Sequence, residues 1–186
     1  IDIGTTSVKT ILISSEGKTV DEATQDHDLL SAHPGWAEED AGVWWEDTLT
    51  AVNKITERHP ELLGNIKGIG VSGMVPAIVM LNDKGEPVRN TIQQNDARAI
   101  SQIRRVKEGI DQTELFARTG GYTNQQHVIP RLLWVKEMEP SVYQKTVCVM
   151  GSYDYIVYRL TGKQSVEWNW AVESGMFDIH EGKWIP

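Results

Sequence analysis

The first nine residues, IDIGTTSVK, place an acid at the end of an apolar run and follow it with small and hydroxyl-bearing residues. Asp2 can order a metal ion through water at such a strand end. Gly4, Thr5 and Thr6 let backbone N–H groups approach phosphoryl oxygens closely. The pattern therefore favours a magnesium and phosphate site. The alternative is a plain hairpin, in which Gly4 supplies an unusual backbone angle and Asp2 caps the turn.

The elements that must position this turn read as a strand meander. Residues 8–13 and 19–28 are predicted to be strands, joined by a turn at residues 15–18. After a loop, Asp40 is expected to cap a helix in which apolar residues recur at helical spacing. That helix is expected to end at His59-Pro60, because the residue before a proline is disfavoured in a helix.

The rest of the chain is predicted to alternate between strands and helices. Residues 66–72 and 77–81 are expected to be strands, with residues 66–72 buried and residues 82–85 forming a hairpin turn after the second. The later elements are a short buried strand at 147–150, helices at 97–108, 112–119, 130–138 and 153–160, and strands and turns over 164–184. Strands first and strand–helix alternation afterwards predict an α/β fold, a mixed sheet flanked by helices.

Composition narrows the class of protein. The 186 residues, 40% of them hydrophobic and 24% charged, suffice for one domain with a real core. No apolar run is long enough to span a bilayer and no signal peptide is present, so no membrane partner is expected. The net charge of −8, with no basic stripe, argues against a nucleic-acid partner. The single cysteine, Cys148, excludes a disulfide within the chain and indicates a reducing, cytoplasmic location.

Four blocks carry a resemblance that covers the whole chain. They are DIGTTSVK at 2–9; PGWAEED at 34–40, followed by Trp44-Trp45; GVSG at 70–73 through NDAR at 95–98; and PRLLWV at 130–135 with DYIVYRLTG at 154–162. In this order the blocks resemble the N-terminal domain of the FGGY family of carbohydrate kinases. The resemblance implies the ribonuclease-H-like fold of the actin, sugar kinase and chaperone ATPase superfamily, in which two domains close over a cleft.

The resemblance also implies an activity, the ATP-dependent phosphorylation of a sugar or polyol hydroxyl with Mg²⁺. Residues 1–186 would be the sugar-binding domain, and ATP would bind mainly to a C-terminal domain that this chain lacks. The family's general base lies in a glycine-aspartate loop, and no such loop appears before Pro186. The chain opens inside a predicted strand and stops after a structured run, so we expect a piece of a larger protein that is inactive alone. Lys9 would bring positive charge to the phosphates, or lie on the strand surface.

Two stretches correspond to positions that contact the sugar substrate in members of the family. Met74, Val75 and Pro76 follow the expected strand at 66–72, and Val75 and Pro76 fall where xylulose kinases carry a methionine–histidine pair. Loss of that histidine puts xylulose itself in doubt. Gln94 stands where many members have tryptophan, which adds hydrogen-bonding capacity at the expense of an apolar wall. Asp96 corresponds to a cleft residue near the sugar.

The structural alternative for Asp96 is an ion pair with Arg98 that caps the helix starting near Ala97. A third stretch, with Gln126 and His127, aligns with a sugar-contacting loop of glycerol kinases. For His127 taken alone, a solvated polar loop is the simpler interpretation.

The function expected from the resemblance is phosphorylation of a pentulose such as xylulose, or of a related ketose or polyol. Homodimers are common in the family and are a further implication. An actin-like or chaperone-type ATPase shares the acid–glycine–threonine–threonine turn, but the blocks at Trp36 and at residues 95–98 argue against it. A non-catalytic sugar-sensing domain is the third hypothesis.

Overall fold

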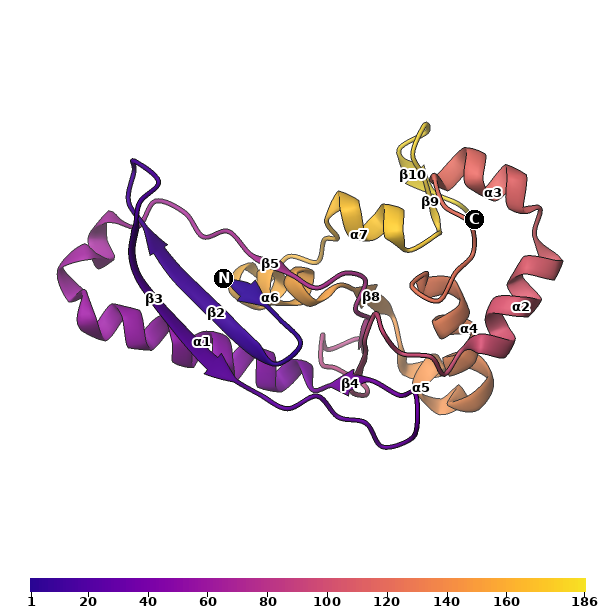
Figure 1. Cartoon of the computed structure of the whole chain (residues 1–186), viewed down its shortest axis with the longest axis horizontal. Coiled ribbons are helices and arrows are strands. Elements are labelled where there is room, and N and C mark those ends of the chain that lie inside the picture. The colour runs from indigo at the N-terminus through magenta and orange to yellow at the C-terminus, as the bar shows by residue number, and fades with distance from the viewer.

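The N-terminal residues build a mixed four-stranded sheet in the computed structural model, which describes all residues 1–186 (Figure 1). The order of the strands is β3-β2-β1-β5, with β1 at Asp2–Ile3, β2 at Ser7–Ile13, β3 at Thr19–Asp26 and β5 at Ser72–Gly73. β1 runs antiparallel to β2 and parallel to β5. The predicted meander is confirmed, and the strand end that carries Asp2 lies between two neighbouring strands.

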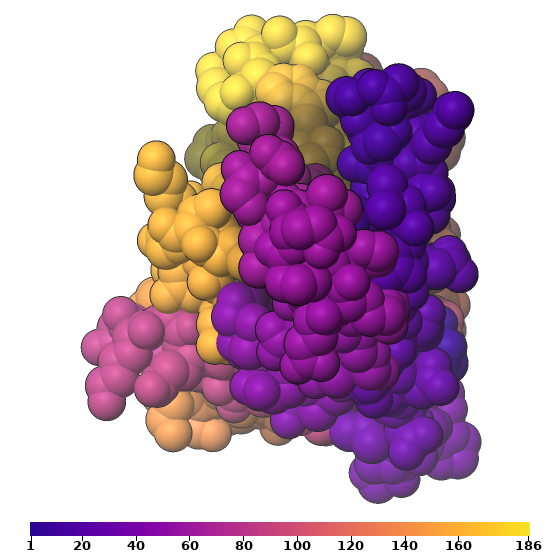
Figure 2. Space-filling view, turned by 90° about the vertical axis from the view of Figure 1, so that its left-hand side faces the viewer, coloured from indigo at the N-terminus to yellow at the C-terminus, as the bar shows by residue number.

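Helix α1 (Ala41–Arg58) packs against the β2–β3 hairpin, and Figure 2 shows the two side by side. Asp40 caps this helix as predicted, since its carboxylate accepts a hydrogen bond of 2.7 Å from the Gly42 N–H. Side chains alternate along β2, where Val8 is buried against the helix and Lys9 is exposed on the opposite face. The exposed face is the one to which Asp2 belongs, because Asp2 and Lys9 are directly opposed in the sheet.

Two short antiparallel ribbons extend the fold away from this sheet. β4 (Glu38–Glu39) pairs with β7 (Thr91–Ile92), and β6 (Val79–Leu81) pairs with β8 (Cys148–Met150). One hydrophobic core joins the first sheet to α1, β6 and β8 and contains Ile3, Val8, Trp44, Val79, Leu81, Met150, Tyr155 and Ile156. The ribbons therefore connect the N-terminal sheet to the helical part of the molecule.

The remaining elements are mainly helical, and α2 to α5 gather at the end of the molecule opposite the hairpin (Figure 1). They are η1 (Pro60–Asn65), α2 (Ile100–Gly109), α3 (Gln112–Thr119), α4 (Val128–Met138), α5 (Pro140–Lys145), α6 (Ser152–Thr161), α7 (Trp168–Glu173), β9 (Phe177–Asp178) and β10 (Lys183–Trp184). A second core around Trp134 and Trp170 packs α4, α6 and α7 against β6 and β7. No helix is long and apolar enough to cross a membrane.

Several predicted elements were wrong in extent. Of the expected strand at 66–72, only Ser72 pairs, and Ile69 is 62% exposed because no element packs over this segment. Pro130 is the third residue of α4 and not the first. The tail contains an unexpected helix, α7, which starts because the Glu167 carboxylate accepts hydrogen bonds from the N–H groups of residues 169 and 170.

Candidate active site

The turn between β1 and β2 leaves two backbone donors free. The Gly4 N–H donates to the Ser7 carbonyl at 2.9 Å, which closes the turn. A Cβ atom at Gly4 would lie 3.0 Å from that carbonyl oxygen, so glycine suits the close approach. The N–H groups of Thr5 and Thr6 have no acceptor within the chain. Two neighbouring free N–H groups are the donors that a phosphoryl group requires.

Asp2 stands beside this turn on the exposed face of the sheet. Its Oδ1 accepts a hydrogen bond of 2.6 Å from the hydroxyl of Ser72, the residue opposite it on β5. Lys9 opposes Asp2 on the other side, but its ammonium group forms an ion pair of 2.8 Å with Glu22. No group of three or more acidic, histidine or cysteine side chains is arranged so that it could hold a metal ion. Mg²⁺ needs only one or two carboxylates besides phosphate oxygens and water, so the residues at Asp2 fit it.

A buried cluster supports the turn from below. The His27 side chain, only 3% exposed, follows β3. Its Nδ1 lies 2.9 Å from Asp47 Oδ2 on α1, and its Nε2 lies 3.3 Å from the Gly4 carbonyl oxygen and 3.7 Å from Glu39 Oε2 on β4. Sequence reasoning missed this cluster, because its members lie far apart along the chain and none has a distinctive local pattern.

Glu39 is the most deeply buried acid of this cluster, at 1% exposure. Its Oε2 accepts a hydrogen bond from the Trp44 indole N–H, whereas its Oε1 has no partner. Burial raises the pKa of Glu39 from 4.5 to about 8, and the Trp44 hydrogen bond opposes this shift. The carboxyl group is therefore mostly neutral at pH 7.

Glu39→Gln is expected to flatten the dependence of stability on pH. The folded-state pKa of Glu39 is raised, so the folded protein holds a proton that the unfolded chain has lost between pH 4.5 and about 8. The free energy of unfolding should fall across this window by up to about 1.4 kcal/mol per pH unit in the wild type. Urea unfolding at pH 5, 6.5 and 8 measures the slope. Glu46→Gln, an exposed position on the same helix as Trp44, is the control; equal slopes in all three proteins would contradict the prediction.

Asp96 is buried and fully engaged by the protein. Its Oδ2 accepts from the Ala37 N–H at 2.7 Å, and the Arg98 guanidinium donates to both of its oxygens at 2.9 and 2.8 Å. The predicted ion pair with Arg98 is confirmed, but the helix cap is not, since α2 starts at Ile100 without a side-chain cap. Every strong contact of the carboxylate is with the chain itself.

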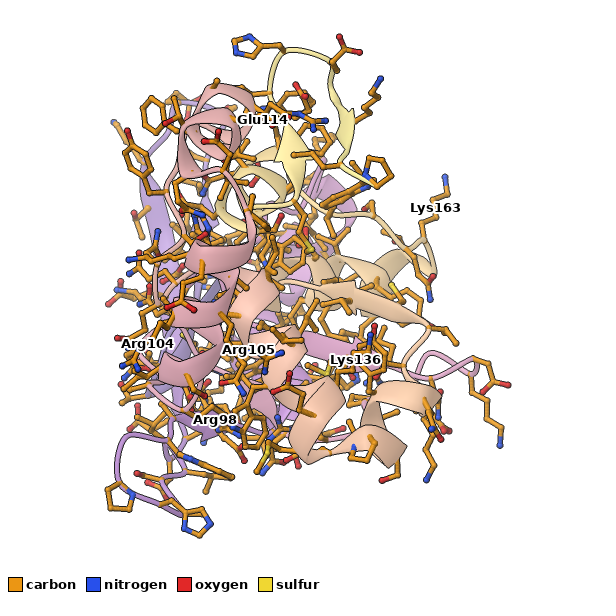
Figure 3. All side chains as sticks on the ribbon, turned by 90° about the vertical axis from the view of Figure 1, so that its right-hand side faces the viewer. Arg98, Arg104, Arg105, Glu114, Lys136 and Lys163 are labelled. Carbon is orange, nitrogen blue, oxygen red and sulfur yellow. The ribbon has the colours of Figure 1, made fainter.

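Arg98 joins this acid to an aromatic wall. Its guanidinium carbon lies 3.8 Å from the centre of the Trp36 ring and its Nη2 lies 2.6 Å from Glu38 Oε1. Trp36 thus packs on Arg98 and Trp134. Arg98 precedes α2, whose Arg104 and Arg105 lie further along the helix (Figure 3).

Arg131 brings together the stretch that contains Gln94 and the stretch that contains Gln126. No role was predicted for this arginine from the sequence. This fully buried side chain on α4 donates to the Gln93 carbonyl at 2.8 Å and to the Gln126 carbonyl. Burial lowers the pKa of Arg131 to about 10. The exposed Gln126 side chain and the half-buried Gln94 side chain are thereby held on adjoining segments. The only sequence signal for this position was that Arg131 stands in the fourth block, PRLLWV at 130–135.

The other predicted substrate residues differ in accessibility. Met74 and Val75 are half-buried just after β5. The Met74 carbonyl accepts a hydrogen bond of 2.9 Å from the Ser152 hydroxyl at the start of α6. His127 is 4% exposed and packs between Gly121 and Gly175, so the interpretation as a solvated loop residue was wrong. Its Nδ1 has no partner, and burial together with the nearby Arg131 charge lowers the pKa of His127. The ring is neutral in the interior.

Comparison with known proteins decides the family. The profile of the FGGY family of carbohydrate kinases, N-terminal domain, matches residues 1–186. The chain belongs to this family. The xylulose kinases of Staphylococcus xylosus and Bacillus subtilis (strain 168) are each 30% identical to it over 184 residues, 99% of this chain and 38% and 37% of those proteins. Membership excludes the actin-like and chaperone alternatives.

The fold agrees with that of a solved relative. The crystal structure of xylulose kinase from Rhodospirillum rubrum superposes with a TM-score of 0.95 at 39% identity, covering 98% of this chain and 38% of that one. The expected fold class of the sugar kinases, a mixed sheet with flanking helices, is therefore confirmed. This FGGY chain spans a little over a third of the length of the relatives it matches.

Proposed function

We propose that the protein transfers the γ-phosphoryl group of ATP to a hydroxyl of a sugar or polyol, and that this chain is its sugar-binding half. The nucleotide domain and the general base would lie in the rest of the protein. The observation that carries the proposal is the pair of free N–H groups at Thr5 and Thr6 beside the exposed Asp2 carboxylate. In a chain of the FGGY family, the evident role of these N–H groups and this carboxylate is to bind the phosphates of a nucleotide.

The roles of the residues follow from their positions. Asp2, oriented by Ser72, would hold Mg²⁺ through water. When bound, the ion neutralises charge on the phosphate oxygens. The Thr5 and Thr6 N–H groups would bind the transferred phosphoryl group, and the tight Gly4 turn fixes both donors before the substrate arrives. The Lys9 ammonium, paired with Glu22, would add only a diffuse positive field.

For the substrate we propose a pentulose such as xylulose, or a related ketose or polyol. The relatives named xylulose kinases support this class, and the half-buried Met74 and Val75 would form its wall against the carbon chain. Gln94 and Gln126 would donate and accept hydrogen bonds with hydroxyl groups. Asp96 and His127, both buried, would shape this wall from behind. The same family likeness supports a cytoplasmic location and a homodimer. Light scattering of the whole protein tests the homodimer.

A substrate panel tests the proposal. The whole protein, with ATP and Mg²⁺, is expected to release ADP with one or more of xylulose, ribulose, fuculose, erythritol, glycerol and gluconate, in proportion to the sugar phosphate formed. ATP hydrolysis without any sugar phosphate would contradict the proposal. Sugar binding without turnover, measured by calorimetry, would instead favour the sensing domain.

A further inference from the structure

Both ring nitrogens of His27 face oxygen atoms. Nε2 faces the Gly4 carbonyl oxygen at 3.3 Å, and a carbonyl oxygen can only accept a hydrogen bond. Nδ1 faces the Asp47 carboxylate at 2.9 Å, which is also an acceptor when ionised. Nε2 contacts Gly4 as a donor when it carries a proton, and the contact of Nδ1 with Asp47 holds the ring in this orientation.

The contact with Gly4 determines where the next N–H group points. The carbonyl of Gly4 and the N–H of Thr5 belong to one planar trans peptide, so they point in opposite directions. Holding the Gly4 oxygen inward on His27 therefore directs the Thr5 N–H away from the core. The His27 backbone N–H also donates to the Thr6 carbonyl at 3.0 Å, which holds the far side of the turn. His27 is thus the one residue that contacts the turn through both its ring and its backbone.

We propose that His27, held by Asp47, is the positioning residue of the phosphate turn and keeps the Thr5 and Thr6 N–H groups directed at the phosphates of ATP. This inference rests on the proposed kinase function and adds a residue to it. The titratable groups that face the ring are Asp47 from α1 and Glu39 from β4. Because the ring is 3% exposed, water cannot replace it as the donor to Gly4. Loss of the ring donor leaves the turn free to rotate its peptide.

Two substitutions separate the contacts of the ring. In His27→Gln the side-chain amide takes the place of Nε2 and can still donate to Gly4. In His27→Asn the amide takes the place of Nδ1 and keeps only the contact with Asp47. In the whole kinase, His27→Asn is expected to lower kcat/KM for ATP by roughly 10- to 100-fold, with the KM for the sugar unchanged. His27→Gln should retain most of the wild-type value.

His59→Asn is the matched control. His59 also contacts α1 and an acid, since its Nε2 lies 3.0 Å from Asp21, but it sits at the opposite end of the helix from the turn. This variant should retain wild-type kinetics. Equal losses in His27→Asn and His27→Gln, or an equal rise in the KM of both substrates, would overturn the proposal in favour of a general structural role.

A spectroscopic readout does not depend on activity. In whole protein labelled with ¹⁵N-histidine, the His27 resonance, assigned by its loss in His27→Gln, should show a proton on Nε2, the nitrogen that faces the Gly4 carbonyl oxygen. A ring whose Nε2 carries no proton would overturn the proposal. This measurement also separates the two claims: a protein without turnover refutes the kinase function, whereas the nitrogen shifts test His27 in either case.

Discussion

Asp2→Asn is expected to lower kcat of the whole protein in the proposed phosphoryl transfer by roughly 10²- to 10³-fold, the usual loss when one preorganised electrostatic contact to a transition state is removed. Asparagine keeps an oxygen that can accept from the Ser72 hydroxyl, so the local geometry should survive. What it loses is the charge that would hold Mg²⁺ at the end of β1. Steady-state kinetics across a Mg²⁺ titration measure the effect, and part of the loss should be recovered at high Mg²⁺.

The control for this substitution is Glu22→Gln. Glu22 is another exposed carboxylate on the first sheet, but its partner is Lys9 and it lies on β3. Its neutralisation should leave kcat within about twofold and cost little stability, as for most exposed ion pairs. Unchanged turnover in Asp2→Asn, or an equal loss in both variants, would refute the role given to Asp2. Circular dichroism and the thermal midpoint establish that both variants are folded.

Asp96→Ala is expected to destabilise the protein by about 3–5 kcal/mol, because it leaves a buried cation without its main partner. The Arg98 side chain is fully buried and its guanidinium donates to both oxygens of Asp96. The substitution also removes the acceptor of the Ala37 N–H. Glu38 alone remains as a counter-charge at 2.6 Å, so only part of the loss is recovered. Urea unfolding gives the difference in free energy.

Asp111→Ala provides a comparison at an exposed carboxylate. Asp111 caps α3 by accepting from the N–H groups of residues 113 and 114, and losing such a cap costs about 1 kcal/mol. The loss at Asp96 should be clearly larger. If the two variants lose the same stability, the Asp96–Arg98 pair is not the buried anchor described above. If Asp96→Ala is stable but loses sugar affinity, a direct role of Asp96 with the sugar is supported instead.

Local patterns were sufficient for the elements that lie close together in the chain. The hairpin of β2 and β3 and the cap at Asp40 were both predicted, because each depends on neighbours within a few residues. The segment at 66–71 failed for the opposite reason. Its apolar residues resemble a strand, but a strand is buried only if other elements cover it, and none covers Ile66 or Ile69.

The sequence alone determined the tight turn at Gly4, the order of most elements and, through four blocks in register, the family. Only the tertiary structure decided that His27 and Asp47 lie beneath Gly4, that Arg131 joins the loops of Gln93 and Gln126, and that Asp96 is buried. The physical reason is the range of the interactions. Caps, turns and periodicity act over a few residues, whereas the ring of one residue and the carbonyl of another meet only after the sheet and its helices have packed.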